Sequence, residues 1–389
     1  MRLNGMRGVC GLAALAVAAV LAGGPFPAPA AEPIKVGVPG PLSGPYANAG
    51  IDIVNAAKLA ADQINAKGGV LGRPLEIVAE DDACDPQTAV QAAQKMIDSG
   101  VVAVAGGYCS GAALPELSTL HRRNIPYILD ASTNPRLTEL GYKDVFRTIG
   151  RDDEQGPFAA SFIANALHAK RAAVVNDNTT YAKGLADATV AALKKLGVDV
   201  VYNNAITPGQ LDYSPVLTRI ASLNPDVIYF TGYFAEGGLM VKEARELHLK
   251  PVFMGGDGNN DPTLLKTAGS AANGMFITCA PLPQFLSGAK TFVDDYTKQF
   301  GHGPGPYSAY EYDAIGVLAS AIERAKATTP DAINAALAET KDYPGITGDI
   351  TFNAKGDRAV AVYIVVTVKN DEFAPYMQLN AAGQWVSMQ

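Results

Sequence analysis

Residues 34–80 read IKVGVPGPLSGPYANAGIDIVNAAKLAADQINAKGGVLGRPLEIVAE, and this stretch decides the fold class. Two short apolar runs, Ile34–Val38 and Leu75–Ala79, have the length of β-strands. Between them lies a helical pattern that should stop at Gly68-Gly69, with apolar residues at Ile53, Ala57, Ala60, Ala61 and Ile64. A strand, a helix and a second strand in this order predict a parallel pair joined by a crossover helix.

The same alternation continues through most of the chain. Val101–Ala105 and Ile125–Leu129 are the next predicted strands, and their residues are apolar on both faces, as buried parallel strands require. The pattern restarts near Arg171, and Ala359–Val368 is predicted as one long β segment. In the second unit we expect strands at 172–175, 198–201, 227–230 and 252–254. These patterns predict an α/β protein with two doubly wound, Rossmann-like lobes and a ligand cleft at the carboxyl ends of the strands.

Composition narrows the function classes. The chain has 389 residues, which favours two or three domains, and it is 48% hydrophobic and 18% charged, which excludes intrinsic disorder. Lys plus Arg number 31 and Asp plus Glu 38, for a net charge of −7, and no basic tract occurs. We therefore expect no nucleic-acid partner.

The N-terminus reads as a signal peptide covering residues 1–30. Arg2 and Arg7 precede an apolar, Ala-rich run at Val9–Ala22, and small residues at 28–31 predict cleavage after Ala30 or Ala31. The alternative is a membrane anchor, but the run is too short for the roughly 20 residues that span a bilayer. The sequence thus predicts export to the periplasm and no nucleic-acid headpiece.

Export would leave three cysteines in an oxidising compartment. Cys84 and Cys109 each follow an apolar strand-like run, so the carboxyl edge of a parallel sheet would bring them near enough for a disulfide. Cys279 is left over, and we expect it to be a buried free thiol.

Motifs for catalysis, cofactors and metals are missing from the sequence. No G-x-S-x-G, G-x-G-x-x-G or complete P-loop occurs, and the four histidines are scattered. The segment Asp257–Asp261 resembles a calcium loop but lacks its Gly and Glu. Asp81, Asp82 and Asp85 form an acidic cluster, which we interpret as a polar loop rather than a cation site. We expect no cofactor, no metal and no enzymatic activity, against the alternative of an exported hydrolase.

The loops after the predicted strands are instead rich in hydroxyl and tyrosine side chains. Ser and Thr at helix starts offer hydroxyls beside free backbone N–H groups, which suits a carboxylate, although helix capping is the commoner role. A lone Asp on an opposite loop suits an ammonium group. The loops are Gly40–Tyr46, Gly107–Gly111, Asp130–Pro135, Asn176–Tyr181, Thr231–Phe234 and Gly255–Gly258.

The order and spacing of several short motifs resemble the leucine/isoleucine/valine-binding proteins, the periplasmic type I binding proteins of ABC transporters. The resemblance covers nearly all of residues 33–370. Its most specific motif is Asp81-Asp-Ala-Cys84-Asp-Pro86. The others include Leu42-Ser43-Gly44-Pro45, Asp62–Gly69, Asp153–Pro157, Gly232-Tyr233, Phe253–Gly255 and Lys355–Asp357.

This resemblance implies a disulfide between Cys84 and Cys109 and a set of ligand contacts. Ser110 and Thr133 match the residues that bind the ligand carboxylate. The ammonium would be held by the Ala131 carbonyl and by Asp257, where the family has Glu. Tyr181 and Tyr233 match aromatics that close over the ligand. The family often has an aromatic at the position of Ala49, and Tyr46 or Tyr108 could fill that role.

The family also implies a domain division, a mechanism and partners. Lobe 1 would comprise residues 32–150 plus 281–361 and lobe 2 residues 151–280 plus 362–389, joined by a three-segment hinge. The expected function is capture of an amino acid, branched-chain or aliphatic, and its delivery to a membrane permease by a monomeric protein. The alternatives are a relative that binds amides, urea or aromatic acids, and a periplasmic ligand sensor for a membrane receptor.

Overall fold

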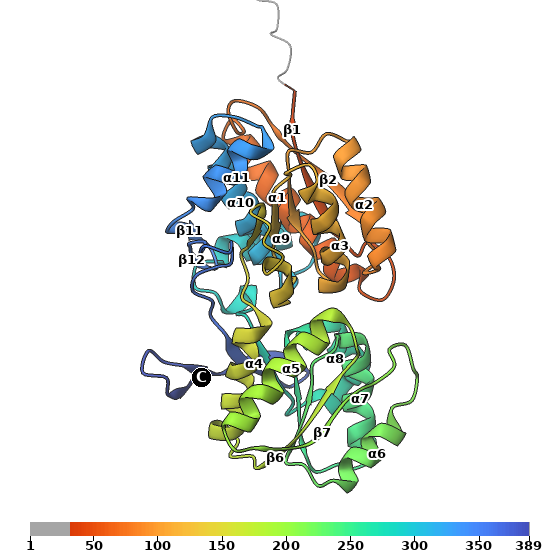
Figure 1. Cartoon of the computed structure of the whole chain (residues 1–389). Coiled ribbons are helices and arrows are strands. Elements are labelled where there is room, and N and C mark those ends of the chain that lie inside the picture. The colour runs from red at the N-terminus through yellow and green to blue at the C-terminus, as the bar shows by residue number, and fades with distance from the viewer. Residues whose placement is uncertain (1–31, 389) are drawn as a thin grey trace, which may run out of the picture. The chain divides into compact units, whose positions relative to one another are not determined.

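The computed structural model describes residues 32–388 and contains two separate, mainly parallel β-sheets. Figure 1 shows helices packed around each sheet. The predicted signal peptide, with its cleavage site, lies outside the described residues. Within residues 32–388, no helix combines the length and the apolar character that a membrane crossing needs.

The first sheet is entirely parallel and has the strand order β2-β1-β3-β4-β5. β1 and β3 are buried almost throughout, whereas β2, at the edge, is only half-buried, so the expectation of strands apolar on both faces holds best in the middle of the sheet. The strands are β1 (Ile34–Gly40), β2 (Leu75–Asp81), β3 (Ala103–Gly106), β4 (Tyr127–Leu129) and β5 (Val145–Arg147).

The helices around the first sheet lie on both of its faces. The chain moves one way from β1 to β2 and the other way from β2 to β3, so right-handed crossovers place α1 and α2 on opposite faces. Accordingly α1 packs against α10, and α2 packs against α3. The helices are α1 (Ala47–Ala66), α2 (Pro86–Asp98), α3 (Ser110–His121), α9 (Lys290–Phe300), α10 (Ser308–Ala325) and α11 (Pro330–Ala338). A small hairpin, β11 (Tyr343–Gly345) with β12 (Gly348–Ile350), follows α11.

The second sheet repeats the same topology and then extends it. Its order is β15-β14-β13-β10-β9-β8-β6-β7, with β6 to β10 parallel and the last three strands antiparallel. The strands are β6 (Arg171–Asn176), β7 (Asp199–Ala205), β8 (Val227–Phe230), β9 (Val252–Gly255), β10 (Phe276–Cys279), β13 (Ile364–Lys369), β14 (Glu372–Leu379) and β15 (Trp385–Ser387). Its helices are α4 (Asp152–Ser161), α5 (Thr180–Lys195), α6 (Ser214–Ser222), α7 (Phe234–Glu246) and α8 (Pro262–Ala268).

The chain passes between the two sheets three times: after β5, after β10 and before β13. These connections contact one another, since the Tyr363 hydroxyl donates to the Arg151 carbonyl at 2.8 Å. The predicted β segment Ala359–Val368 is wrong at its start, because the strand begins only at Ile364. Val360 and Val362, which suggested a strand, are 72% and 53% exposed in the connection.

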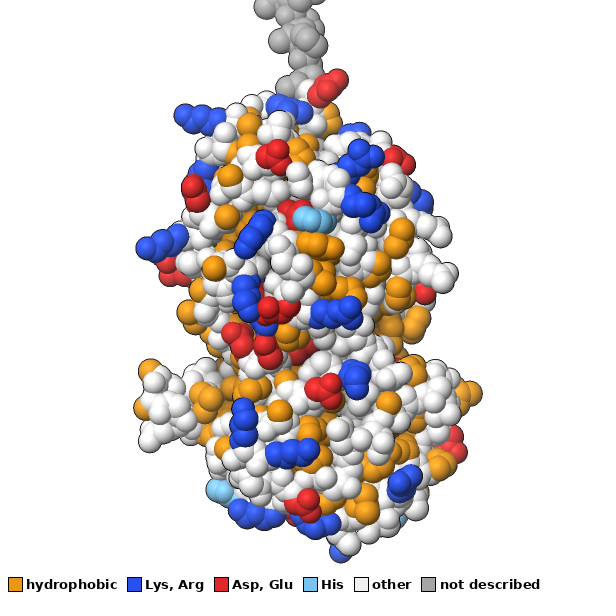
Figure 2. Space-filling view, viewed as in Figure 1, with side chains coloured by type: hydrophobic (Ala, Val, Ile, Leu, Met, Phe, Trp, Pro, Cys, Tyr) orange, Lys and Arg blue, Asp and Glu red, His pale blue; other side chains and the backbone are white. Residues whose placement is uncertain are grey.

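The visible surface carries charges of both signs. On the face drawn in Figure 2, Lys and Arg side chains are interspersed with Asp and Glu around both sheets and their helices. Cys279, at the end of β10, is a buried free thiol, as expected.

Candidate functional site

The candidate site lies where loops from both sheets meet. In each sheet the strand order reverses between two neighbouring strands, β1 and β3 in the first and β6 and β8 in the second. The loops after such strands diverge to opposite faces and leave a crevice for a ligand. The loops that follow these four strands and β4 and β9, with the first turns of the helices after them, carry the residues predicted to bind the ligand.

Five tyrosines from these loops and from the start of α10 form one cluster, called here the tyrosine cluster. Their rings pack with centroids 4.9 Å apart for Tyr46 and Tyr233, 5.0 Å for Tyr181 and Tyr233, and 5.5 Å for Tyr108 and Tyr233. Tyr307 lies 5.5 Å from Tyr108. Tyr46 is half-buried, and the other four are buried. The cluster therefore joins the two sheets by aromatic packing.

Tyr307 was missed by the sequence analysis. It immediately precedes α10, whereas the predicted site residues follow strands. A signal was present in the Gly305-Pro306-Tyr307 turn at the start of a strongly apolar helix. Ala49 is buried within α1, and the Tyr46 and Tyr108 rings both lie in the tyrosine cluster.

Asp257 is a buried carboxylate inside this arrangement, with only 2% of its surface exposed. It follows β9 and starts a short 3-10 turn. The Tyr181 hydroxyl donates to its Oδ1 at 2.7 Å, and the Tyr307 hydroxyl lies 3.1 Å from its carbonyl oxygen and 3.4 Å from Oδ2. Burial raises the pKa of Asp257, and the hydrogen bond from Tyr181 partly opposes the rise. A cationic group would compensate this buried charge better than the neutral hydroxyls do.

Ser110, Ala131 and Thr133 are all buried and lie on the side of the first sheet. Ser110 begins α3, where the first N–H groups have no partner within the helix, and its Oγ accepts from the Asn134 N–H at 3.3 Å. The Thr133 hydroxyl lies near the buried Asp152 carboxyl, but neither makes a hydrogen bond of standard geometry. Hydroxyls and a helix N-terminus at one place suit an anionic group.

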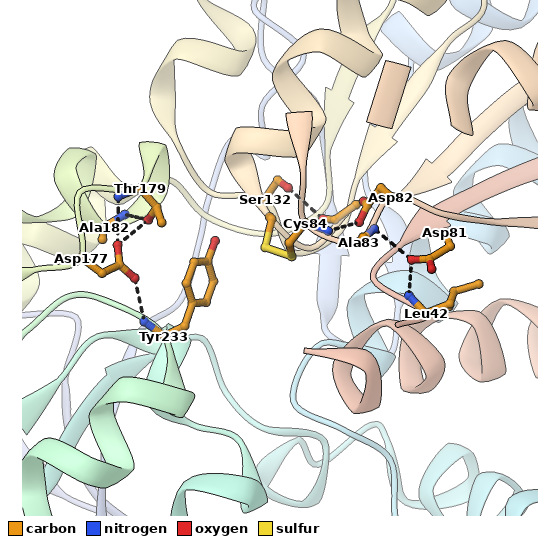
Figure 3. Close-up of a disulfide and its surroundings, with 12 residues drawn as sticks. Leu42, Asp81, Asp82, Ala83, Cys84, Ser132, Asp177, Thr179, Ala182 and Tyr233 are labelled. Atoms are coloured by element: carbon orange, nitrogen blue, oxygen red, sulfur yellow. Dashed lines mark hydrogen bonds between the residues drawn. A yellow bond between two sulfur atoms is a disulfide. The ribbon is translucent and has the colours of Figure 1, made fainter. Parts of the chain in front are cut away.

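The disulfide joins Cys84 to Cys109, with their Cα atoms 5.4 Å apart. Figure 3 draws this bond. It ties the loop after β2 to Cys109, which immediately precedes Ser110 at the start of α3. The three nearby acids accept hydrogen bonds from backbone N–H groups. Asp81 accepts from the Leu42 N–H at 2.8 Å and Asp82 from the Cys84 N–H at 2.8 Å, and Asp85 caps α2. In residues 32–388 no group of three or more His, Cys, Asp or Glu side chains is arranged to hold a metal ion.

Asp177 positions the loops that the second sheet contributes to the site. Its Oδ1 accepts from the Thr179 hydroxyl at 2.7 Å, and its Oδ2 accepts from the Tyr233 N–H at 3.3 Å (Figure 3). Burial raises the pKa of this carboxyl too. These bonds fix the loop after β6 against the loop after β8, which sets the direction of the Tyr233 side chain.

Two further hydrogen bonds connect elements of the two sheets around the cluster. The Asn48 amide on α1 donates to Asp261 Oδ2 at 2.7 Å, beside the N-terminus of α8. The Asn134 amide donates to the Thr180 carbonyl at 2.8 Å. Together with the Tyr307 hydroxyl on Asp257, these contacts link segments associated with the two sheets on several sides of the tyrosine cluster. The whole arrangement suits a small molecule that carries one positive and one negative group.

Known proteins share this fold over most of the chain. The model of a family described as periplasmic binding protein matches residues 33–372. A solved leucine-binding protein of Thermotoga maritima is 31% identical, with a TM-score of 0.84, and the match covers 90% of this chain and 100% of that one.

Two curated relatives come from Pseudomonas aeruginosa. One, named amino acid binding protein, is 36% identical over 95% of this chain and 98% of its own length. The other, named leucine-, isoleucine-, valine-, threonine- and alanine-binding protein, is 33% identical over 95% and 96%.

Proposed function

The chain belongs to the periplasmic binding protein family, and we propose that it binds an amino acid among the tyrosine cluster, Ser110, Thr133 and Asp257. The family consists of binding proteins rather than enzymes, and this member is the solute-binding component of an ABC transporter. The relatives' names range from alanine to leucine, which supports an aliphatic ligand without fixing its size.

The observation that carries the proposal is the buried Asp257 carboxylate. Its side-chain partners are neutral, namely the hydroxyls of Tyr181 and Tyr307 and the amide of Gln155, so no cation within residues 32–388 compensates its charge. An ammonium group placed against it would form a charge-assisted hydrogen bond in a site shielded from water. Across the cluster, Ser110, Thr133 and the start of α3 would receive the α-carboxylate, and the Ala131 carbonyl would help to hold the ammonium.

The two sheets define two lobes in this proposal. Lobe 1 comprises residues 32–150 plus 281–361, and lobe 2 comprises residues 151–280 plus 362–389, with a hinge at the three connections. Ligand contacts from both lobes would favour the closed arrangement, which a membrane permease would then recognise. The protein would act in the periplasm as a monomer.

A thermal-shift screen of the mature protein tests the proposal. The protein is first stripped of ligand by unfolding and refolding, and then mixed with the twenty amino acids, urea, short amides and aromatic acids. A ligand that binds only the folded state raises the melting temperature by mass action. We expect aliphatic amino acids to raise it. A shift produced only by the compounds that are not amino acids would overturn both the ligand class and the role of Asp257.

A further inference from the structure

We propose that Asp52 on α1 and Asp261 before α8 form a pH-sensitive switch, because their carboxylates repel each other when the proposed lobes close and protonation of Asp52 relieves that repulsion. Ligand would then bind more tightly in mildly acidic conditions than at neutral pH. The inference rests on the proposed function, since it treats the two sheets as lobes that close around an amino acid. It gives a regulatory role to two acids that lie outside the proposed ligand contacts.

The two acids come from different sheets and line the same groove. Asn48 and Asp52 lie one turn apart on α1 and therefore share one face of that helix. The Asn48 amide donates to Asp261 Oδ2 at 2.7 Å, which places this face of α1 against the start of α8. Asp52 and Asp261 accordingly line one groove of about 590 Å³, together with Lys266 and residues 302–305. Closure of the lobes thus brings a second carboxylate toward Asp52.

Three neighbours hold Asp52 on its own side of the groove. The Tyr296 hydroxyl on α9 donates to Asp52 Oδ1 at 2.8 Å, and His302 Nδ1 lies 3.7 Å from the same oxygen. The Ser308 hydroxyl on α10 donates to the Asp52 carbonyl at 3.3 Å and adds no charge. All three residues belong to the same proposed lobe as α1, so these contacts should remain when the lobes separate.

Across the groove, the side of the second sheet presents Asp261 and Lys266. Asp261 is only 3% exposed and is held by Asn48, whereas Lys266 is exposed, so water and salt screen its ammonium. Lys266 offsets part of the charge of Asp261, but Asp52 still experiences Asp261 as a like charge. Ionised Asp52 therefore opposes the approach of the second lobe.

The titration of Asp52 gives the switch its direction. Burial raises the pKa of Asp52 to about 6 and the charge of Asp261 adds to the rise, while the Tyr296 bond and His302 oppose it. Separation of the lobes removes Asp261 and admits water, so this pKa should fall toward the ordinary value near 3.9. Closure then takes up a proton below about pH 6 and becomes more favourable as pH falls through that range. Ligand affinity should rise with it, because binding is coupled to closure.

Isothermal titration calorimetry with leucine and alanine, on the ligand-free mature protein between pH 5 and pH 7.5, tests the switch. Asp52→Asn removes the charge and keeps an oxygen that can accept from Tyr296. At pH 7.5 the variant should bind more tightly than the wild type, and this advantage should shrink by a factor of about three or more toward pH 5. Other titrating groups, among them Asp257, act alike in both proteins and cancel in the ratio of affinities.

Two outcomes separate this inference from the proposed function. A ratio of affinities that is the same at every pH would overturn the switch and leave the proposed function intact. A wild-type protein that binds no amino acid at any pH would overturn the proposed function and the switch with it.

Further variants test the pairing of the two acids. The advantage of Asp52→Asn at pH 7.5 should be smaller in a chain that also carries Asp261→Asn, because the repulsion is then already absent. An equal advantage would contradict the pairing. Asp62→Asn is the matched control, since this exposed acid on α1 also accepts from α9, through Gln299 at 3.0 Å, and it should bind as the wild type does at every pH. Loss of the pH dependence in His302→Gln but not in Asp52→Asn would assign it to His302 and overturn the proposal.

Discussion

At the scale of single residues, Asp257 carries the electrostatic argument. It is the buried acid whose partners come from both sides of the site, Tyr181 on α5 and Tyr307 before α10. A buried carboxylate without a cationic partner destabilises the free protein, and a ligand ammonium relieves that penalty. The same charge therefore lowers stability without ligand and raises affinity for it.

We predict that Asp257→Asn weakens amino acid binding by about 100-fold, the equivalent of about 3 kcal/mol for an unpaired buried charge partner. The fold should survive, because the amide oxygen can still accept from Tyr181. Calorimetry gives the affinity and thermal melting the stability. Asp199→Asn, at an exposed acid paired with Arg171, is the matched control and should bind as the wild type does.

The same carboxyl makes binding dependent on pH. Because burial raises the pKa of Asp257 in the free protein, its carboxyl takes up a proton at a higher pH than an exposed Asp would. A protonated Asp257 cannot pair with an ammonium, so affinity should fall as pH is lowered, starting above the ordinary Asp range near 3.9. Asp257→Asn should lack this decline. An identical decline in the variant would assign it to another group.

Glu311 on α10 gives a second pH prediction, for stability. Both of its carboxyl oxygens are buried without a hydrogen-bond partner, and burial, followed by the charge of Asp130, raises its pKa. Between the ordinary Glu value near 4.3 and the raised value, the folded chain binds more protons than the unfolded chain. The free energy of unfolding therefore falls as pH rises through that range.

Glu311→Gln should remove this contribution, about 1.4 kcal/mol for each unit by which the pKa is raised. Urea unfolding at pH 5 and pH 8 measures it, and the variant should lose less stability than the wild type over that interval. Glu372→Gln, at an exposed position on β14, should keep the wild-type dependence. Equal dependence in Glu311→Gln would show that Glu311 stays charged when folded.

Sequence reasoning at this scale found residues by their place after strands. That rule selected the loops that hold Ser110, Thr133, Tyr233 and Asp257, because parallel strands bring such loops to one edge of a sheet, and the family resemblance then singled out these four residues. It could not locate Tyr307, whose hydroxyl reaches Asp257 only through the folding of a segment 50 residues further on. It also could not show that Tyr108 and Tyr307 pack against each other.

At the scale of elements, a buried ion pair fixes the connections between the sheets. Arg147 on β5 is fully buried, and its Nε lies 3.0 Å from Asp357 Oδ1. Arg151, just before α4, donates to Asp357 Oδ2 at 2.6 Å. One carboxylate thus holds the first and third connections together.

We predict that Asp357→Asn lowers the free energy of unfolding by about 3–5 kcal/mol, because it leaves the buried Arg147 charge unpaired. Urea denaturation measures the change. Lys355→Ala, two residues away, removes an exposed ammonium that pairs with Glu139 at 2.6 Å and should change stability by less than about 1 kcal/mol. Similar effects of the two substitutions would mean that the buried pair is not specifically stabilising.

Most helices and strands could be predicted from the sequence, and the β segment Ala359–Val368 is the exception. Strands buried on both faces, such as β1 and β3, are recognisable in the sequence as continuous apolar runs. The run at Ala359–Val368 failed because the chain before Ile364 is held away from the sheet. There the Arg358 guanidinium donates to the carbonyls of Thr148 and Thr347, both at 2.9 Å. Such distant partners leave no trace in local periodicity.

At the scale of the whole molecule, ligand binding is coupled to lobe closure, so a contact that stabilises the closed arrangement also raises ligand affinity. The hydrogen bonds from Asn48 to Asp261 and from Asn134 to Thr180 join the proposed lobes without using the residues assigned to the ligand. If they form only in the closed arrangement, they add to the affinity of every ligand by favouring that arrangement. They should not affect the choice between ligands.

Asn48→Ala should therefore weaken the binding of all amino acids by the same factor, roughly 10- to 100-fold for the loss of one hydrogen bond to a charged group. The factor should appear mainly as faster dissociation, because the bond holds the closed form together. Stopped-flow fluorescence measures the rates, calorimetry the affinities, and small-angle scattering whether ligand still compacts the variant.

Gln94→Ala provides the control, because the Gln94 amide bonds to Asp98 on the same helix and joins nothing across the site. It should leave rates and affinities unchanged. A changed ratio between alanine and leucine in Asn48→Ala would place Asn48 within the ligand site. Unchanged affinity for every ligand would mean that the Asn48 bond also forms in the free protein, so that closure depends on the ligand contacts alone.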